Sequence, residues 1–248
     1  MPIRQSVHGK VLVVHMERES KRNAIDEEMS LGIGAALDRL DDDDQLWAGI
    51  ITGTETVFSA GTDLKAGSGY TERGGEYGII RRRRRTPLIA AVEGPALGGG
   101  FEIAMACDLI VAASDARFAL PETRRGLVAT SGALFRAARA LPVHVAKQLL
   151  ITGAGLTADR AYDLGLVNVV TEPGKALEGA LALAEDICVS SPVAVRETLA
   201  AIEAQFVDTD ERGWEATARA AEAVKSSEDM KEGIAAFFER RGPRWRGH

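Results

Sequence analysis

Residues 87–112, PLIAAVEGPALGGGFEIAMACDLIVA, form the most unusual segment of the chain. Its apolar pattern predicts a strand over 88–92, a helix over 101–107 and a second strand over 109–112. Strand, helix and strand in this order favour a mostly parallel sheet with crossover helices. The three consecutive glycines at 98–100 cost stability at a helix start, so we expect another feature of the site to require them.

This glycine turn combines two properties that suit an oxyanion. Glycine lets a ligand approach the backbone closely, and the first N–H groups of the following helix are unpaired donors at the positive end of its dipole. A tight strand-to-helix turn with close packing is the alternative interpretation. Glu102 lies in the first helical turn, where it is either a carboxylate stabilised by the positive end of the helix dipole or a catalytic group.

A second loop, residues 58–64 (FSAGTDL), follows the strand predicted over 47–52 at a distance suited to the same end of a parallel sheet. Its small residues would again present backbone N–H groups to a ligand. Asp63 on its own is typical of a helix N-cap rather than of a catalytic residue.

A third motif is residues 118–122 (FALPE), in which Glu122 follows a proline in an apolar, strand-like run. An exposed glutamate at a strand end is the competing interpretation. If Glu102 and Glu122 converge, they would form an acid/base pair, and their mutual repulsion would keep one of them protonated.

The same alternation of strands and helices extends over the chain from its start to about residue 175. Further strands are predicted over 11–16 and 167–170, and a helix over 26–40 with Asp26 as its N-cap. Beyond it, long helices are predicted over 176–206 and 212–240, broken near Pro192 and around Ser226. We divide the chain into a core domain, 1–190, and a helical region, 191–248, whose apolar faces need a partner.

Composition excludes several classes of protein. The 248 residues are 46% hydrophobic and 27% charged, which indicates a globular chain rather than a disordered or fibrous one. A net charge of -6 argues against nonspecific nucleic-acid binding. No charge-free apolar run approaches the roughly 18 residues of a membrane span, and the first ten residues lack the apolar core of a signal peptide. We expect a cytoplasmic protein that binds neither nucleic acid nor membrane.

No cofactor or metal motif is present. The pairs Gly32/Gly34 and Gly153/Gly155 lack the third glycine of a dinucleotide fingerprint, so we expect no nicotinamide or flavin cofactor. Cys107 and Cys188 are too far apart in sequence to form a redox or zinc motif, and the four histidines lack ligand spacing. We expect no metal.

Taken together, the motifs resemble the crotonase superfamily, the enoyl-CoA hydratase and isomerase group. The similarity covers nearly the whole chain, in residues 21–25, 58–65, 87–108, 118–127, 149–153, 158–170 and 236–245. It implies an α/β fold, the ClpP/crotonase-like spiral of ββα units, with a C-terminal α-helical oligomerisation region. Members form a homotrimer, often as a dimer of trimers (a hexamer).

The resemblance also implies roles for the three motifs. The backbone N–H groups of Thr62 and Gly99 match the oxyanion hole that binds the thioester carbonyl of an acyl-CoA. Glu102 and Glu122 match the two catalytic glutamates of hydratases. A water held between them adds across the 2,3 double bond of an enoyl-CoA, with Glu102 as base toward the water and Glu122 giving its proton to C2.

The implied activity is that of a lyase, an enoyl-CoA hydratase of fatty-acid metabolism, including β-oxidation, or of related acyl-CoA metabolism. It needs no cofactor, because CoA is part of the substrate. The resemblance further implies contacts with CoA from two loops and from the C-terminal region. These residues are Lys21, Arg22, Ala24, Ala60, Asp63, Leu64, Phe237 and Arg240.

Arginines occupy all five positions of the run 81–85. One interpretation is a nuclear signal or RNA-binding patch. The interpretation that we favour is a solvated helix face, beside the acyl part of the site in related chains, that guides the polyanionic CoA.

One departure from the family pattern concerns the loop after Glu122. Hydratases continue there with Gly-x-x-Pro-Gly-x-Gly-Gly, whereas this chain has GLVATSGA over 126–133. Thr130 stands where a glycine backbone helps to hold the catalytic water, so its hydroxyl either replaces that contact or narrows the site. Together with the Gly-Gly-Gly-Phe-Glu centre and the Arg-Trp-Arg-Gly end, this is similar to the carnitinyl-CoA dehydratase-like branch.

Three functions therefore remain open from the sequence. The first is the hydratase, or a related carnitinyl-CoA dehydratase-like lyase, because both glutamates are present. The second is an enoyl-CoA delta isomerase, which needs only one well-placed carboxylate. The third is a catalytically weak acyl-CoA-binding homologue, motivated by Thr130.

Overall fold

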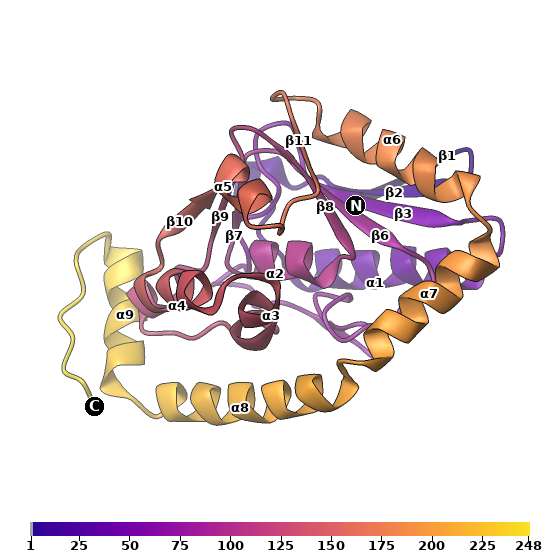
Figure 1. Cartoon of the computed structure of the whole chain (residues 1–248). Helices are drawn as coiled ribbons and strands as arrows, with labels where there is room; N and C mark the ends of the chain where they lie inside the picture. The colour runs from indigo at the N-terminus through magenta and orange to yellow at the C-terminus, as the bar shows by residue number, and fades with distance from the viewer. Residues whose placement is uncertain (1) are drawn as a thin grey trace.

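The computed structural model describes residues 2–248, and its centre is a six-stranded sheet in the order β1-β2-β3-β6-β8-β11 (Figure 1). All neighbouring pairs are parallel except β1 with β2. The strands are β1 (Ile3–His8), β2 (Val11–Met16), β3 (Ala48–Thr52), β6 (Leu88–Val92), β8 (Leu109–Ala113) and β11 (Val169–Thr171). The five strands predicted from apolar runs are confirmed to within two residues at each end.

Strand β1 was not predicted. Its sequence, IRQSVH, is mostly polar because the strand lies at the edge of the sheet with no residue fully buried. An antiparallel hairpin with β2, which pairs Ile3 with Met16 and His8 with Val11, holds it in the sheet, and Ile3 packs against the core beside α1. An edge strand of this kind lacks the apolar run on which the other predictions rest.

A second, three-stranded sheet lies next to the first in the order β10-β9-β7. Its strands are β10 (Gly155–Thr157), β9 (Arg117–Ala119) and β7 (Pro95–Leu97). The chain passes from β6 into β7 and from β8 into β9. Each of these two units therefore contributes one strand to the large sheet and the next strand to the small sheet. A short hairpin of β4 (Tyr70–Thr71) and β5 (Gly75–Glu76) forms the third sheet.

Helices cover both faces of the large sheet. Helix α1 (Glu27–Asp42) packs its buried residues against one face, and Asp26 caps it by accepting the N–H of Met29 at 3.0 Å, as predicted. Helix α6 (Ala176–Val189) covers the opposite face with Ala176, Ala180 and Ala184. The fold therefore has two apolar cores, one on each side of the sheet (Figure 1).

Shorter helices connect the strands around the small sheet. They are α2 (Gly99–Ala106), α3 (Ala133–Ala140), α4 (Val143–Thr152) and α5 (Ala158–Asp163), with the single-turn 3₁₀ helices η1 (Glu19–Lys21) and η2 (Glu122–Arg125). Helix α2 is buried along nearly its whole length. Because β7 leads directly into it, the glycine turn lies at the end of the small sheet.

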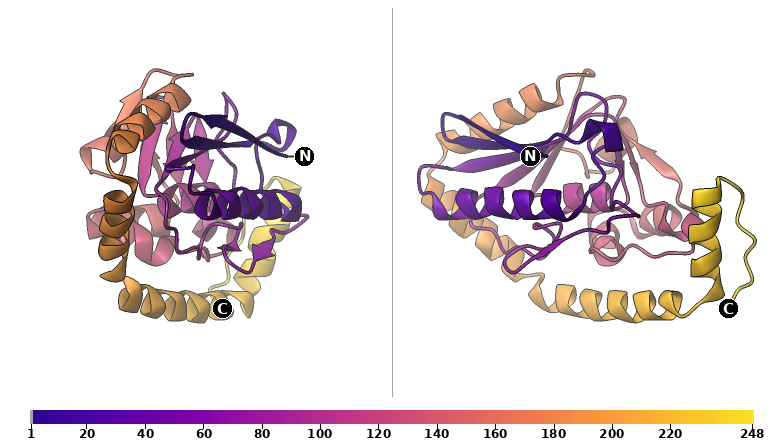
Figure 2. Two further views of the ribbon diagram at one scale, coloured as in Figure 1. Left: turned by 90° about the vertical axis from the view of Figure 1, so that its right-hand side faces the viewer. Right: turned by 180° about the vertical axis from the view of Figure 1, so that it is seen from behind.

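Three C-terminal helices run around the outside of the core (Figures 1 and 2). They are α7 (Pro192–Ala204), α8 (Val207–Lys225) and α9 (Glu228–Glu239). The breaks predicted near Pro192 and Ser226 are confirmed, whereas α8 begins at Val207, five residues before the predicted start. Helix α7 has no buried residue and α8 has one, Thr217. Within residues 2–248, no helix is long and apolar enough to cross a bilayer.

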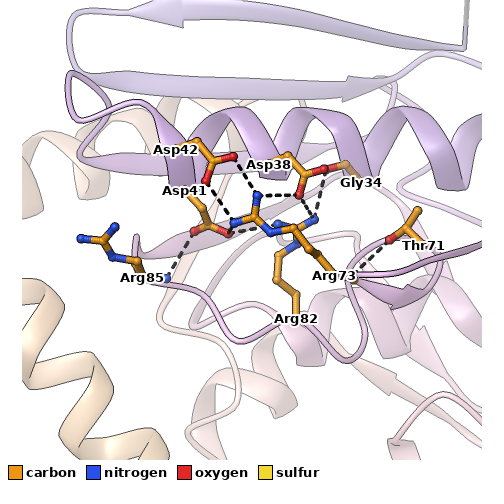
Figure 3. Close-up of polar contacts among 9 residues, drawn as sticks. Gly34, Asp38, Asp41, Asp42, Thr71, Arg73, Arg82 and Arg85 are labelled. Carbon is orange, nitrogen blue, oxygen red and sulfur yellow. Dashed lines mark hydrogen bonds and ion pairs between the residues drawn. The ribbon is translucent and has the colours of Figure 1, made fainter.

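The arginine run 81–85 is not a solvated helix face, so this prediction was wrong. The segment is irregular, and the side chain of Arg82 is only 2% exposed. Its guanidinium binds Asp38 at 2.7 Å, Asp41 at 3.1 Å and the carbonyl of Gly34 at 3.1 Å, all on α1 (Figure 3). The acidic end of α1 and the arginine run therefore neutralise each other inside the fold.

The other arginines of the run divide between buried and exposed positions. Arg84 binds Asp108 at 2.7 Å with a side chain 9% exposed, and Arg81 stacks on the ring of Trp214 in α8 at 3.9 Å. Arg83 and Arg85 are exposed. The run thus fixes the segment between the β4–β5 hairpin and β6, which carries residues of the site described next.

Candidate active site

The two predicted oxyanion donors, the N–H groups of Thr62 and Gly99, lie on adjacent segments. Thr62 forms an isolated parallel bridge with Ile25. In this bridge the N–H of Ile25 donates to the carbonyl of Gly61, and the carbonyl of Ile25 accepts the N–H of Asp63. This pattern turns the N–H of Thr62 away from Ile25. A Cβ on Gly61 would lie 2.9 Å from the nitrogen of Gly99. Across residues 2–248, neither predicted donor is bonded to a backbone carbonyl.

The glycine turn is needed because side chains of the site approach it closely. Gly98 has a φ of 53°, and a Cβ there would lie 2.9 Å from Oε1 of Glu122. A Cβ on Gly99 would collide with the phenol of Tyr77, 2.7 Å from its Cζ atom. Contact with two polar side chains therefore requires Gly98 and Gly99, whereas a Cβ on Gly100 would collide with the backbone of Ser59, as the alternative interpretation of close packing expects.

Glu102 is buried in the first turn of α2, with 2% of its surface exposed. Its Oε1 accepts the backbone N–H groups of Ser131 at 2.7 Å and of Ala133 at 3.0 Å. Burial and the nearby charge of Glu122 raise its pKa to about 7, against the lowering effect of the two N–H groups. The carboxyl group is thus held in one orientation and titrates near neutral pH.

Glu122 begins η2 directly after Pro121 and lies against the glycine turn. Burial raises its pKa, while its own backbone N–H and Arg125 act in the opposite direction. Its Oε2 is buried and has no hydrogen-bond partner among the described residues. Gly98, against which the Glu122 carboxylate lies, is the N-cap residue of the helix that carries Glu102, and the two carboxyl groups are close enough for the charge of Glu122 to raise the pKa of Glu102.

Two further polar residues of this site were missed by the sequence analysis. The hydroxyl of Tyr77 lies 2.7 Å from Oγ1 of Thr62, and its side chain is 4% exposed. Ser131 is 2% exposed and supplies the N–H that binds Glu102. No motif marks either residue, although the strong preference of Tyr for a polar partner when buried is a general signal.

Arg136 in α3 supports the loop that holds Glu102. It donates to the carbonyl of Ile80 at 2.7 Å and to that of Ser131 at 3.5 Å. Burial lowers its pKa to about 10, partly offset by Asp210. The guanidinium therefore links the Ser131 loop to the segment after Tyr77.

The residues predicted to contact CoA gather at one side of the Thr62 segment. The Lys21–Arg22 turn is exposed, and the carbonyl of Arg22 accepts the N–H of Ala60 at 2.9 Å. Ala24 is half-buried and Leu64 is 39% exposed. These loops therefore lie side by side with accessible residues.

Asp63 in the same loop is used in structural contacts. Its carboxylate binds Arg18 at 2.9 Å and accepts the N–H of Lys65 at 3.1 Å, in a turn that resembles the predicted N-cap. The Arg18 bond is the main cause of its lowered pKa. Arg18 also binds Asp26 at 3.0 Å, so it holds the loop before α1 against the Thr62 loop.

Helix α9 brings the C-terminal region to the site. It packs on η2, where Gly233 contacts the backbone of Arg125, and the guanidinium of Arg125 lies 4.6 Å from the ring centre of Phe237. Arg240 caps α9 with a φ of 55° and is exposed. Phe237 and Arg240 therefore lie on the helix that covers the turn carrying Glu122.

Thr130 lies beside the site but is exposed, while its neighbour Ser131 is buried. A cavity of about 730 Å³ lies elsewhere, between α7, the end of α2 and the arginine run, and neither glutamate lines it. No group of three or more candidate metal ligands occurs among residues 2–248.

The sequence matches a known protein family over nearly its whole length. A family model described as enoyl-CoA hydratase/isomerase matches residues 6–248. The chain is 39% identical to a putative enoyl-CoA hydratase of Thermus thermophilus over 248 residues, covering 96% of this chain and 98% of the relative. It is 37% identical to a carnitinyl-CoA dehydratase of Salmonella arizonae over 258 residues, covering 99% and 98%.

The fold comparison leads to the same family. The structure of a carnitinyl-CoA dehydratase from Mycobacterium avium superposes with a TM-score of 0.93 at 42% identity, covering 100% of this chain and 99% of that one. The predicted crotonase fold is thereby confirmed. A family model that spans almost the whole sequence, with relatives of equal length, establishes that this chain belongs to the enoyl-CoA hydratase/isomerase family.

Proposed function

We propose that this protein is an enoyl-CoA hydratase, a lyase that reversibly adds water to the 2,3 double bond of a 2-enoyl-CoA thioester. One observation carries the proposal. The buried carboxyl group of Glu102 and the half-buried side chain of Glu122, whose Oε2 is buried, lie at a glycine turn beside two free backbone N–H groups. This arrangement supplies both the acid/base pair and the anion stabilisation that the reaction needs.

In the proposed mechanism the thioester oxygen binds between the N–H groups of Thr62 and Gly99. Attack of water at C3 shifts electrons onto this oxygen, and the two donors stabilise the resulting enolate. Removal of one such donor typically costs about 2.7–4 kcal/mol of transition-state stabilisation. The barrier therefore depends on the direction of two backbone bonds rather than on the side chain of Thr62.

The two glutamates take different roles because their surroundings differ. Glu102 accepts two N–H bonds on Oε1, which hold its carboxyl group in one orientation; its pKa is raised to about 7, so above that pH its ionised form serves as the base that removes a proton from the attacking water. Glu122 has a buried, unpartnered Oε2 and a raised pKa, which suits an acid that gives a proton to C2. The hydroxyl from water ends on C3 and the proton on C2, so the reverse reaction regenerates water.

Binding of the CoA part is proposed for the exposed residues around the Thr62 loop and α9. The loop of Ala60, Asp63 and Leu64 is bonded to the Lys21/Arg22/Ala24 turn through the carbonyl of Arg22, and the exposed cations of this turn suit the phosphates of CoA. Phe237 and Arg240 on α9 would reach the CoA of the same or a neighbouring subunit. Thr130, exposed next to the Glu102 loop, would contact the substrate or its water.

Assembly is proposed as a homotrimer or a dimer of trimers. The C-terminal region 191–248 supports this, because α7 carries exposed apolar residues such as Val193 and Ile202, with 63% and 47% exposure. The division into domains 1–190 and 191–248, a role in fatty-acid β-oxidation and a cytoplasmic location stay predictions.

A double-bond isomerase is the second candidate, favoured by the near-neutral titration of Glu102, which would let one carboxyl group carry a proton between two carbons. Water labelled with ¹⁸O distinguishes the two. The hydratase incorporates the label at C3, whereas an isomerase yields a shifted enoyl-CoA without it.

The test is the absorbance of the enoyl thioester with crotonyl-CoA, measured for wild type, Glu122→Gln and the exposed control Glu172→Gln. We expect loss of absorbance and a 3-hydroxyacyl-CoA product with wild type and the control. Glu122→Gln should be slower by about 10²–10⁴-fold. A wild type that binds CoA thioesters without turnover would overturn the proposal and favour the binding homologue.

A further inference from the structure

The hydroxyl of Tyr77 is bonded to side chains from two different loops. It lies 2.7 Å from Oγ1 of Thr62, and it also forms a hydrogen bond with the side chain of Ser131. Thr62 carries one of the two proposed oxyanion donors, and the backbone N–H of Ser131 binds Glu102 at 2.7 Å. One phenol therefore joins the segment proposed to stabilise the enolate to the segment that orients the proposed base.

The ring of Tyr77 contacts the residue that carries the second proposed donor. A Cβ on Gly99 would lie 2.7 Å from Cζ of Tyr77, so the phenol lies directly on the Cα of this glycine. Only 4% of Tyr77 is exposed. A phenylalanine would pack on Gly99 in the same way, so packing alone does not account for the buried hydroxyl, whereas its two bonds do.

The backbone around Tyr77 is fixed by the same two parts of the site. Tyr77 has a φ of 56°, a left-handed conformation that is an outlier for a bulky side chain and persists only where the surrounding structure imposes it. Three residues later, the carbonyl of Ile80 accepts Arg136 at 2.7 Å, and Arg136 also donates to the carbonyl of Ser131 at 3.5 Å. The segment 77–80 is thus attached to the Ser131 loop at both of its ends.

We propose that Tyr77 is a positioning residue of the site: its hydroxyl holds the Thr62 loop and the Ser131 loop together, so that an oxyanion donor and the Glu102 carboxyl group face the same substrate. Tyr77 acts through these loops and transfers no proton itself. Burial raises the pKa of its phenol, so the hydroxyl stays protonated and keeps both bonds at neutral pH. The inference rests on the proposed function for the roles of the Thr62 N–H and of Glu102.

Loss of this hydroxyl should change the titration of Glu102. The backbone N–H groups of Ser131 and Ala133 lower the pKa of Glu102, and burial raises it. Without its bond to Tyr77, the Ser131 loop would hold the carboxylate less firmly, and loss of the phenol oxygen would leave the carboxylate in less polar surroundings. Both effects favour the protonated form, so the pKa of Glu102 should rise above about 7.

The experiment measures this pKa by ¹³C NMR of protein labelled at the glutamate carboxyl carbons, with Glu102→Gln to assign the resonance. The proteins are wild type, Tyr77→Phe, Ser131→Ala, the double variant and the control Tyr70→Phe, which removes a hydroxyl from a tyrosine that is 62% exposed. Tyr77→Phe keeps the packing on Gly99, and Ser131→Ala keeps the backbone N–H that binds Glu102. The titration does not depend on turnover.

We expect the pKa of Glu102 to rise by about 0.5–1 pH unit in Tyr77→Phe and in Ser131→Ala, the size of one weakened hydrogen bond. Tyr70→Phe should match wild type. Because Tyr77→Phe and Ser131→Ala break the same bond, the double variant should shift the pKa no further than Tyr77→Phe alone. An unchanged pKa in Tyr77→Phe would overturn the inference, as would two shifts that add in the double variant.

Hydration of crotonyl-CoA at pH 9, where Glu102 is largely ionised in every variant, tests the bond to Thr62 separately. We expect kcat of Tyr77→Phe to fall about three- to tenfold with KM little changed, because the charge on the thioester oxygen develops only toward the transition state. An unchanged kcat would overturn the link to the Thr62 loop. A shifted pKa without any hydration by wild type would overturn only the proposed function.

Discussion

The carboxylate oxygen Oε1 of Glu102 accepts the backbone N–H of Ser131 at 2.7 Å, across 29 residues of sequence. The helix that carries Glu102 thus depends on the loop after η2 for the orientation of its carboxyl group. Burial raises the pKa of this group and the N–H of Ser131 lowers it, with a net value of about 7.

The rate should depend on pH through Glu102. As the proposed base it must be ionised, so kcat/KM for crotonyl-CoA should fall as pH drops below about 7, the pKa of the buried group. A pH profile between 5 and 9 measures this limb. A profile that stays flat down to pH 5.5 would show that no group of this pKa acts as the base.

Stability should carry the opposite dependence. The folded pKa of Glu102, about 7, lies above the ordinary value of 4.5, so its contribution is fully present below pH 4.5 and is lost as pH rises through 7. Glu102→Gln removes this loss. The difference in free energy of unfolding, Glu102→Gln minus wild type, should therefore be larger at pH 8.5 than at pH 5, by up to about 3 kcal/mol.

Urea unfolding at the two pH values tests this prediction. The exposed carboxylate of Glu172 provides the control, because Glu172→Gln should show the same pH dependence as wild type. If Glu102→Gln and wild type lose stability in parallel from pH 5 to pH 8.5, the carboxyl group is not held above its ordinary pKa.

The mostly parallel sheet was predictable because its signals are local, and local patterns also marked Glu102 and Glu122 as candidates, whose roles only the family resemblance implied. Apolar runs mark the buried strands, and Glu102 is placed by its position in the first turn after three glycines. Strand β1 was not predictable in this way, because its residues gain stability from pairing with β2 rather than from burial.

Tyr77, Ser131 and Arg82 could not be found because their roles arise from contacts distant in sequence. Arg82 binds Asp41 from 41 residues away, and a run of arginines is ordinarily a solvated surface. Tyr77 follows a hairpin without an apolar pattern, and its hydroxyl bonds the side chains of Thr62 and Ser131, which lie in two other segments. Such contacts depend on how the segments pack, and no spacing within one segment reveals them.

The glycine turn should not tolerate even one methyl group. In Gly99→Ala the new Cβ would overlap the Tyr77 phenol and displace it or the turn, so the Gly99 N–H would leave its direction. We expect a loss of kcat/KM of about 10²–10³-fold, as for the loss of an oxyanion donor.

Gly155→Ala is the matched control, since its Cβ would have no neighbour nearer than 3.9 Å. It should keep wild-type activity, and circular dichroism should show both variants folded. Near-normal hydration by Gly99→Ala would mean that this turn does not bind the thioester oxygen.

The arginine run offers a test of fold stability within a single segment. Arg82→Met keeps the apolar stem but leaves Asp41, whose side chain is 3% exposed, without its closest cation at 3.1 Å. Breaking a buried ion pair from one side costs about 3–5 kcal/mol, because the remaining charge stays desolvated. The exposed neighbour Arg83 gives the control, and Arg83→Met should change the free energy of unfolding by less than about 0.5 kcal/mol. Urea denaturation measures both, and equal stabilities would mean that the arginine run is solvated after all.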